Sequence, residues 1–419
     1  MNRLTTAWGE FGLTRFPEHP RDTLRAWDTA DEYLLRHLAG TDGTEAGPKD
    51  PDEPADSAEP SEPTESTDPA EPTDLSGTVV VVGDRWGALT TVLAARRLEQ
   101  LVTGPLVQIT DSYLTQQATR ANLRRAGAGT DAVRLLSVRD TPPDRIDVLL
   151  IRVPKSLALL EDQLYRLAPG VHPGTVVVGT GRVTEIHTST LKLFEQILGP
   201  TRTSLAVRKS RLILSAPAAG RVRAPSPWPH SYELPDEIGA VSGRTVVNHA
   251  GIFCAERLDI GTRFFLRNLP RSRGRDHVVD LGCGNGVIGT AVALDNPEAR
   301  VTFIDESFSA VASAEATFRK NVDARTLAEF VLGDGLSDVP AGTVDLVLNN
   351  PPFHTHQATT DATAWRMFTG ARAALRPGGE LWIVGNRHLG YHAKLRRLFG
   401  NCETVTSDPK FVVLRAVKR

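Results

Sequence analysis

An ordered series of strand-like segments that occurs twice constrains the fold of this chain most strongly. Each copy has, in order, an apolar run that enters a glycine turn, a run that ends in aspartate, a run that ends near a proline and a run that follows Leu-x-Pro-Gly. In the first copy these runs are residues 78–82, 106–111, 147–154 and 174–179. In the second copy they are residues 277–281, 301–305, 345–351 and 380–385. Amphipathic, helix-like stretches lie between these runs, such as 89–101 and 308–320. This alternation indicates βαβ units and a mostly parallel sheet with helices on both faces. The sequence therefore predicts an α/β protein with two tandem Rossmann-like domains.

An acidic stretch interrupts the first copy. Residues 41–76 contain twelve acidic residues, one lysine and a single large apolar residue, Leu75. Such a segment buries too little apolar surface to offset its ordering entropy, so we expect a disordered acidic insertion. We interpret it as a spacer, with mimicry of RNA phosphates as the alternative. It carries a charge of −11, so the remainder of a chain with a net charge of −2 carries +9. A basic folded part permits a polyanionic partner without establishing one.

Several function classes are excluded by composition. No apolar run approaches the ~20 residues that span a bilayer, and the N-terminus lacks the apolar region of a signal peptide. Cys254, Cys283 and Cys402 form no Cys-x-x-Cys pair, which indicates a reducing compartment, no disulfide framework and no zinc site. We therefore expect a soluble, cytoplasmic protein that binds neither a metal nor a membrane, and that is a monomer.

The first strand of the second copy leads into a glycine-rich turn. The residues that define it are Asp280, Gly282, Gly284 and Gly286. Glycines at a strand-to-helix turn allow a ligand to approach the backbone closely. Gly284-x-Gly286-x-x-Gly289 also satisfies the dinucleotide fingerprint, with Asp305 about 20 residues further on, so a nicotinamide enzyme stays an open alternative.

Three features favour S-adenosylmethionine over a dinucleotide. Asp280 precedes the first glycine, where its carboxylate attracts a cationic amino-acid tail. Asp334 ends the third strand, where it can accept a hydrogen bond from an adenine amino group. The sequence Asn-Pro-Pro-Phe follows the fourth strand. Ligands of open parallel sheets bind beyond the carboxyl ends of strands, and all these features fall there.

The Asn-Pro-Pro-Phe segment, Asn350, Pro351, Pro352 and Phe353, predicts methyl transfer to a planar nitrogen. An exocyclic amino nitrogen is a poor nucleophile because its lone pair is delocalised into the ring. The Asn350 side-chain oxygen and a main-chain carbonyl can accept its two N–H groups and direct the lone pair towards the methyl group. Consecutive prolines make this edge rigid, and Phe353 can stack on a flat ring. His354 is a candidate for contact with the base edge, and no carboxylate or cysteine completes a metal site with the nearby His356.

Residues 245–419 resemble the class I S-adenosylmethionine-dependent methyltransferases. More narrowly, they resemble the tandem-domain ribosomal RNA guanine-N2 methyltransferases, and within these the large-subunit (23S) enzymes. The segments that carry the resemblance are 248–253, 258–262, 350–354, 364–368, 379–384, 386–389 and 411–417. The resemblance implies a seven-stranded sheet with a reversed last hairpin. It also implies cofactor contacts from Asp280, Gly282, Asp305 and Asp334, and substrate contacts from Asn350 to Phe353; we place Asn350 against the cofactor as well.

The first copy keeps the strands but loses the chemistry. Residues 83–87 replace the triple-glycine turn, and we expect Trp86 to fill the space that a cofactor needs. Arg152 and Lys155 stand where Asn-Pro-Pro-Phe would be. We therefore predict that this domain binds no cofactor and helps to recognise RNA. The predicted division is 1–40 as its N-terminal segment, 41–76 as the insertion, 77–220 as the degenerate domain, 221–244 as the linker and 245–419 as the catalytic domain.

Clusters of basic residues are candidates for RNA contacts. In the first domain these are Arg120, Arg124, Arg125, Arg208, Lys209 and Arg211, and beside the second they are Arg263, Arg267, Arg271, Arg273 and Arg275. We assign substrate binding to Phe253, in the segment that leads into the active domain, and to Arg263, Arg267, Phe353 and His354. A stacked guanine cannot reach a pocket, so the target is expected in a loop or as an extruded base.

The sequence thus predicts methyl transfer from S-adenosylmethionine to the exocyclic N2 of a guanine in ribosomal RNA, with 23S rRNA preferred over 16S rRNA. One alternative is N5-methylation of a protein glutamine, because the same four residues can hold a side-chain amide. A second alternative is a ribosome assembly factor that binds RNA without catalysis.

Overall fold

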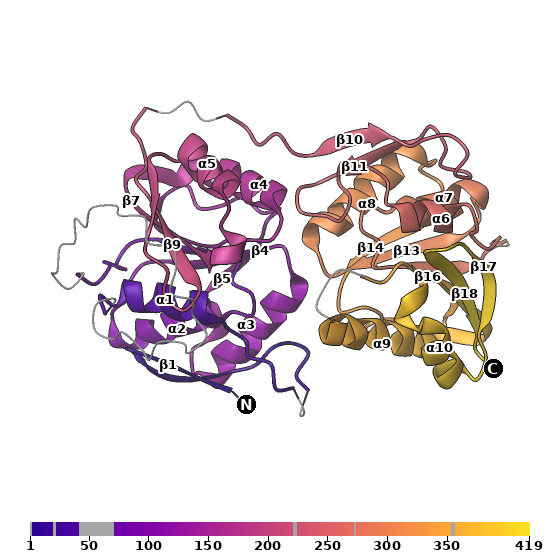
Figure 1. The fold of residues 1–419 in the computed structure, drawn as a ribbon, viewed down its shortest axis with the longest axis horizontal. Helices are drawn as coiled ribbons and strands as arrows, with labels where there is room; N and C mark the ends of the chain where they lie inside the picture. The colour runs from indigo at the N-terminus through magenta and orange to yellow at the C-terminus, as the bar shows by residue number, and fades with distance from the viewer. Residues whose placement is uncertain (1, 20–21, 42–70, 221–223, 272–273, 353–356) are drawn as a thin grey trace. The chain divides into compact units, whose positions relative to one another are not determined.

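The computed structural model describes residues 2–19, 22–41, 71–220, 224–271, 274–352 and 357–419 (Figure 1). The chain divides into two compact units, called here the N-terminal and C-terminal domains. The first consists of Met1–Thr110, Thr115–Leu136 and Asp140–Pro225, and the second of Asp111–Leu114, Ser137–Arg139 and Ser226–Arg419. Residues 42–70 of the predicted acidic insertion lie outside the described residues. In the described ranges no helix is both long and apolar enough to cross a membrane.

The C-terminal domain is built on a seven-stranded sheet with the order β14-β13-β12-β15-β16-β18-β17. The first five strands are parallel, and β18 runs antiparallel to both β16 and β17. This arrangement confirms the expected reversal at the end of the sheet. The strands are β12 (His277–Leu281), β13 (Arg300–Asp305), β14 (Ala328–Leu332), β15 (Val344–Asn349), β16 (Leu375–Asn386), β17 (Glu403–Ser407) and β18 (Phe411–Val417).

Helices cover both faces of this sheet because successive side chains of a strand point to opposite faces. Val278 of β12 packs in one core cluster with residues of α6, α7 and α8, whereas its neighbour Val279 packs in another with residues of α9 and α10. The two helical layers are visible on either side of the strands (Figure 1). The helices are α6 (Ile260–Leu266), α7 (Val287–Asp295), α8 (Phe308–Asn321), α9 (Gln357–Ala374) and α10 (Tyr391–Phe399).

A lead-in segment precedes the C-terminal sheet. Strand β10 (His230–Glu233) pairs antiparallel with β11 (Thr245–Asn248), so part of the stretch 221–244 that was predicted as a linker forms a strand. Strand β11 is held on α8, because the Thr317 and Ser313 hydroxyls accept hydrogen bonds from the backbone of residues 247 and 249. The segment is therefore an integral part of the C-terminal domain.

The N-terminal domain repeats the same order of strands, β5-β4-β3-β6-β7-β9-β8. Its strands are β3 (Val79–Val82), β4 (Leu106–Thr110), β5 (Arg134–Ser137), β6 (Ile146–Arg152), β7 (Val171–Arg182), β8 (Thr201–Thr203) and β9 (Ser210–Ser215), preceded by the hairpin of β1 (Asn2–Thr6) and β2 (Gly9–Leu13). Its helices are α1 (Thr29–Leu38), α2 (Ala88–Arg96), α3 (Tyr113–Arg125), α4 (Leu157–Leu167) and α5 (Thr188–Ile197). Two sheets of the same topology confirm the predicted fold class.

One helix differs from its predicted length. The stretch 89–101 was expected to be a single helix, but α2 ends at Arg96 and a turn of 3-10 helix, Arg97–Glu99, follows it. Gln100 then adopts a left-handed φ of 59°, which an α-helix cannot continue. The predicted helix over 308–320 is confirmed as α8.

Candidate active site

The central parallel strands of the C-terminal sheet carry the predicted site segments to one edge. Leu281 of β12 lies in register between Ile304 of β13 and Asn349 of β15, and Asp305 pairs with Leu332 of β14. The segments that follow these strands are the glycine turn, the turns after β13 and β14, and the Asn-Pro-Pro-Phe segment. They lie beyond the carboxyl ends of neighbouring strands, which is where ligands bind in open parallel sheets.

The turn between β12 and α7 requires its glycines for different reasons. Gly282, Gly284 and Gly286 have φ angles of 69°, 54° and 73°, in the left-handed region that favours glycine. A Cβ on Gly286 would lie 2.7 Å from the Cα of Ala314, so this glycine allows the turn to approach α8. A Cβ on Gly284 would meet no described atom within 4 Å. The turn is therefore closed by packing at Gly286 and open at Gly284.

Asp280 lies beneath this turn with 1% of its surface exposed. Its Oδ2 accepts a hydrogen bond of 2.8 Å from the Gly289 N–H, whereas its buried Oδ1 has no partner among the described residues. Burial raises the pKa of Asp280 to about 7; the Gly289 hydrogen bond opposes this rise and the charge of Asp305 adds to it. Because an unsatisfied buried acceptor costs about 1–3 kcal/mol, Oδ1 is well suited to receive a cationic ligand group.

This raised pKa predicts a pH-dependent affinity for the cofactor. If Asp280 receives the cofactor's ammonium group, only the ionised carboxylate attracts that charge. The affinity for the cofactor is therefore highest above pH 7 and decreases as the pH falls below 7. We expect the Kd for S-adenosylmethionine to rise about tenfold per pH unit between pH 7 and 5. Calorimetric titration of the wild type and of Asp280→Asn measures this. If the Kd of Asp280→Asn kept the pH dependence of the wild type, a group other than Asp280 would be responsible for it.

Asp305 accepts two backbone hydrogen bonds at the end of β13. Its Oδ2 accepts from the Gly284 N–H and its Oδ1 from the Ser307 N–H, each at 3.0 Å. Burial raises the pKa of Asp305, and these hydrogen bonds oppose the rise. The carboxylate thereby fixes the glycine turn against the start of α8. Each oxygen keeps a second lone pair, so the hydroxyl groups of a ribose can still donate to it.

Asp334 follows β14 and is half-buried. Its Oδ1 lies 2.5 Å from the Arg366 Nη2 of α9. Burial raises the pKa of Asp334, Arg366 opposes this rise and Asp338 adds to it. The predicted contact with an adenine amino group stays a prediction. The structure adds that Arg366, which was not among the predicted site residues, holds this carboxylate.

A chain of hydrogen bonds orients the side chain of Asn350. Its Nδ2 donates to the Thr262 Oγ1 at 2.9 Å, and Thr262 in turn donates to the Asp259 Oδ2 through its hydroxyl, at 3.3 Å, and through its backbone N–H, at 2.8 Å. Asp259 is the N-cap of α6. Because the carboxylate only accepts, the Thr262 hydroxyl donates to it and accepts from the Asn350 amide. The Asn350 Oδ1, which is buried, is thereby left without a partner among the described residues.

Thr262 is consequently expected to act as a positioning residue. Thr262→Val keeps the shape of the side chain but removes the acceptor for the Asn350 amide, so the amide loses its fixed orientation. We expect kcat to fall about fivefold, with the KM for RNA unchanged, because one hydrogen bond of this kind contributes about 1 kcal/mol.

Thr262→Ser is the matched control and should retain most of the activity, because its hydroxyl still accepts from Asn350. Single-turnover methylation, the Kd for cofactor and thermal unfolding should be measured together. If the activity of the valine variant fell only as much as its thermal stability, and kcat of the folded enzyme did not change, the positioning role would be contradicted.

The neighbours of Asn350 complete this edge. Asn349 is fully buried and donates from Nδ2 to the Leu281 carbonyl at 2.7 Å, which ties β15 to β12. Pro351 is buried and Pro352 is exposed. Phe353 and His354 lie outside the described residues, so their predicted contacts with the base stay predictions.

The predicted substrate residues Phe253, Arg263 and Arg267 lie in the part of the chain before β12. Phe253 is 52% exposed. Arg263 of α6 and Arg267, the C-cap of this helix, are exposed and lie one helical turn apart, and Thr262 lies on the buried side of α6. Arg267 Nε donates to the Glu237 carbonyl at 2.9 Å. Their roles in binding RNA stay predictions.

In the N-terminal domain two arginines occupy the positions that correspond to Gly284 and Asn350. Its five-residue turn, residues 83–87, also begins and ends with left-handed glycines, so Arg85 matches Gly284. Val82 pairs with Ile151 as Leu281 pairs with Asn349, so Arg152 matches Asn350. The sequence interpretation gave the obstructing role to Trp86, but the turn places Arg85 there, and Trp86 packs on the hydrophobic core of its domain instead.

These arginines converge on acidic residues. Arg152, 1% exposed, lies 2.8 Å from Asp28 and 2.9 Å from Glu185, and Arg85 bridges the same two carboxylates at 3.1 and 2.6 Å. Burial raises the pKa of Glu185, but Arg152 and Arg85 lower it overall to about 2. Burial raises the pKa of Asp31, which faces Arg152 at 3.5 Å. We call these five residues the arginine network; its two arginines stand at the positions that correspond to Gly284 and Asn350 of the other domain.

Other basic residues of the N-terminal domain are partly engaged. Arg125 forms an ion pair with Glu18 at 2.5 Å, and Arg208 with Glu32 at 3.6 Å, whereas Arg124 is exposed. Their predicted contacts with phosphates therefore compete with ion pairs inside the protein, and they stay predictions.

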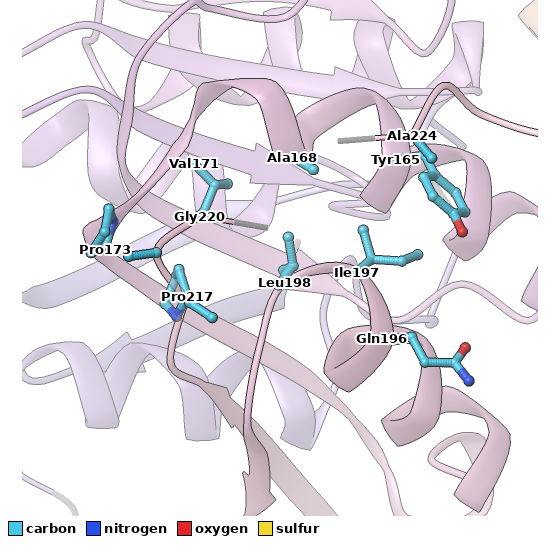
Figure 2. Close-up of a pocket in the computed structure, with 12 residues that line it drawn as sticks. Tyr165, Ala168, Val171, Pro173, Gln196, Ile197, Leu198, Pro217, Gly220 and Ala224 are labelled. Carbon is cyan, nitrogen blue, oxygen red and sulfur yellow. The ribbon is translucent and has the colours of Figure 1, made fainter. Parts of the chain in front are cut away.

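A separate pocket of about 240 Å³ lies in the N-terminal domain between the C-terminal ends of α4 and α5. Tyr165 and Gln196 lie at one end of it and Pro173 and Pro217 at the other (Figure 2). None of the residues that line it is charged. Helices in βα units run back against their strands, so this pocket is at the opposite edge of the sheet from the arginine network. Among the described residues no group of three or more His, Cys, Asp or Glu could hold a metal ion.

Comparisons with known proteins cover the whole chain. Residues 243–415 match the family described as Methyltransferase small domain, and residues 1–48 and 66–219 match the RLMG N-terminal domain. The ribosomal RNA large subunit methyltransferase G of Streptomyces avermitilis is 66% identical over 416 residues, and that of Stutzerimonas stutzeri is 43% identical over 415 residues; each match covers 99% of both chains.

A solved structure shares the fold of the full chain. The T. thermophilus 16S rRNA N2 G1207 methyltransferase, in complex with AdoMet and guanosine, has a TM-score of 0.68 and 19% sequence identity, over 100% of this chain and 98% of that chain. At this identity the likeness concerns the fold. The identities to the curated relatives and their coverage are high enough to place the sequence: the chain belongs to the ribosomal RNA large subunit methyltransferase G family.

Proposed function

We propose that the protein transfers a methyl group from S-adenosylmethionine to the exocyclic N2 of a guanine in 23S ribosomal RNA. The observation that carries this proposal is the Asn350 amide, whose Nδ2 is bonded to Thr262 and whose buried Oδ1 is left to accept. A buried acceptor that has no partner among the described residues, beside two rigid prolines, suits a planar amino group that donates two N–H bonds.

The residues of the glycine turn fit the cofactor. Gly284 leaves open space where a Cβ would otherwise stand, the Asp280 Oδ1 can receive an ammonium group, and Asp305 can accept from a ribose. Asp334, held by Arg366, is the candidate acceptor for the adenine amino group. When bound, the cofactor supplies an electrophilic methyl group on a sulfonium sulfur.

The protein's own contribution to the reaction is then positional. The Asn350 Oδ1 and a main-chain carbonyl, for which Pro351 is our candidate, accept the two N–H groups of the guanine amine. This holds the nitrogen in a geometry that exposes its lone pair on the side of the cofactor. No strong base is needed, because the amine proton becomes acidic once the new N–C bond has formed. Fixed geometry of this kind can account for a large part of a rate enhancement.

The family supports ribosomal RNA as the substrate over a protein glutamine amide, a nicotinamide reaction or a non-catalytic assembly factor, since the relatives are named as methyltransferases of the large ribosomal subunit. Their names also favour 23S over 16S rRNA. An enzyme that acts on ribosomal RNA works where ribosomes are made, so we infer a cytoplasmic location, and we retain the expectation of a monomer.

Labelled S-adenosylmethionine tests the proposal directly. Purified enzyme should be incubated with 23S rRNA, 16S rRNA or a release-factor protein, with both RNAs taken from cells that lack the enzyme. Nucleoside mass spectrometry should then find N2-methylguanosine at one position of 23S rRNA. Label in 16S rRNA, in a glutamine or at another guanine nitrogen would contradict the proposal.

A further inference from the structure

The outer surface of α9 and α10 presents exposed residues that the proposed chemistry does not use. Helix α9 buries Ala364, Phe368 and Ala371 in the core, and α10 buries Tyr391, Leu395 and Phe399. The Phe368 and Tyr391 rings meet edge to face at 5.3 Å, so the two helices pack side by side (Figure 1). Their outer side carries the exposed residues Trp365, Arg372, Arg396 and Arg397, and we call these four residues the α9–α10 face.

The α9–α10 face is basic. Residues 362–374 and 391–399 include no aspartate or glutamate. Arg372, Arg396 and Arg397 are exposed, and none forms an ion pair with a carboxylate that the structure describes. Elsewhere in the same domain Arg366 and Arg415 pair with Asp334 and Glu380. Adjacent unpaired guanidinium groups repel each other, so their grouping favours an anionic partner.

An aromatic side chain lies within this charged surface. Trp365 is 37% exposed, and the Arg397 Cζ lies over its ring, 6.0 Å from the centroid. Trp365 and Arg372 are seven residues apart, which is two helical turns, so both lie on the outer side of α9. An exposed ring beside arginines that pair with no described carboxylate is a combination that can bind single-stranded nucleic acid, in which rings stack on bases and arginines contact phosphates.

Helix α9, which carries Trp365, also contacts the candidate active site. Met367, two residues after Trp365, places its Cε 3.1 Å from where a Cβ on Gly282 would lie, and its sulfur lies 3.8 Å from the Asn349 Nδ2. Helix α9 thus contacts the glycine turn on one side and presents Trp365 to solvent on another. An RNA strand that delivers a base to Asn350 can continue over the outside of this helix.

From these observations we propose that the α9–α10 face binds a single-stranded RNA segment next to the target nucleotide, with Trp365 stacking on a base and Arg396 and Arg397 contacting phosphates. This inference rests on the proposed function, because RNA is the substrate in both. It adds a contact surface on the catalytic domain that is separate from the arginine clusters of the lead-in segment.

Binding of an unstructured oligouridylate of about 12 nucleotides to the full-length protein tests the proposal. The measurement is fluorescence anisotropy over a series of salt concentrations, without cofactor. Arg396→Gln/Arg397→Gln should lower the salt slope by about 1.4, since each phosphate contact with a single strand contributes about 0.7. Trp365→Leu should weaken binding roughly tenfold with an unchanged slope, because stacking carries no charge.

Arg319→Gln/Arg325→Gln is the matched control. It removes the same charge from exposed arginines of the same domain that pair with Glu315 and Asp323, and it should leave RNA binding near that of the wild type. Cofactor affinity and thermal unfolding should be unchanged in all three variants, which establishes that each of them folds.

Three results would overturn the proposal. The first is RNA binding by both variants of the α9–α10 face that equals RNA binding by the wild type. The second is a loss of RNA affinity in the Arg319→Gln/Arg325→Gln control that equals the loss in the face variants. The third is binding of polyglutamate that the same substitutions weaken as much as they weaken RNA binding, which would assign the face to an acidic protein segment. The outcome is independent of methylation: a wild type that binds RNA through this face but forms no N2-methylguanosine would contradict the proposed function alone.

Discussion

Replacing Asn350 with alanine should lower the rate of methyl transfer about 10²–10³-fold, the loss typical of removing one hydrogen-bonding group that acts on the reacting atoms. The Asn350 Oδ1 is buried and has no partner among the described residues, so its loss removes an acceptor for the guanine amine without breaking an internal bond of that oxygen. Single-turnover assays with labelled cofactor, followed by nucleoside mass spectrometry, measure the effect. A decrease smaller than tenfold would show that Asn350 does not hold the reacting nitrogen.

Two control measurements separate this effect from misfolding. Thermal unfolding of the Asn350→Ala protein should change little, because the side chain makes a single hydrogen bond to the residues that the structure describes, with Thr262. The Asn350→Asp variant keeps an oxygen acceptor but loses the Nδ2 donor to Thr262, so its activity should lie between those of the alanine variant and the wild type.

The same substitution at two glycines of one turn should have different main effects, on cofactor affinity at Gly284 and on stability at Gly286. Gly284→Ala places a methyl group in open space, so the domain should fold at a cost of about 1–2 kcal/mol for the left-handed φ of 54°. Its Kd for S-adenosylmethionine should rise at least about 100-fold, because the methyl group takes space that we assign to the cofactor and each 1.4 kcal/mol of clash is tenfold in affinity.

Gly286→Ala should instead destabilise the fold. Its Cβ would lie 2.7 Å from the Ala314 Cα, and such overpacking costs about 1–3 kcal/mol in addition to the strain of the left-handed φ. Chemical denaturation measures the free energy of unfolding, and calorimetry measures cofactor affinity. If Gly284→Ala bound cofactor as tightly as the wild type, the ligand would lie elsewhere.

The sequence was sufficient to predict features that depend on local pattern. A mostly parallel sheet with helices on both faces follows from the βαβ pattern, and the alternation of residues such as Val278 and Val279 between the two helical layers follows from the period of a strand. The gathering of the glycine turn, Asp305 and Asn350 at one edge follows from their places at the ends of parallel strands.

The contacts that orient the site were beyond sequence reasoning because they join distant segments. Thr262 is 88 residues from Asn350, and Arg366 is 32 residues from Asp334. A single chain gives no signal for such pairs, although Asp259 before an apolar stretch is a recognisable helix N-cap. The position of Arg85 could have been found: residues 83–87 and 282–286 have equal length, and aligning their terminal glycines places Arg85 against Gly284.

The arginine network makes single substitutions at this end of the N-terminal sheet costly. Asp28 is the N-cap of α1, so the carboxylate that pairs with Arg85 and Arg152 also ties α1 to the sheet. A glycine at 85 alone would leave Arg152 in place, and an asparagine at 152 alone would leave buried negative charge without its cation, which costs about 3–5 kcal/mol. The N-terminal domain thus uses this end of its sheet to hold its own first helix.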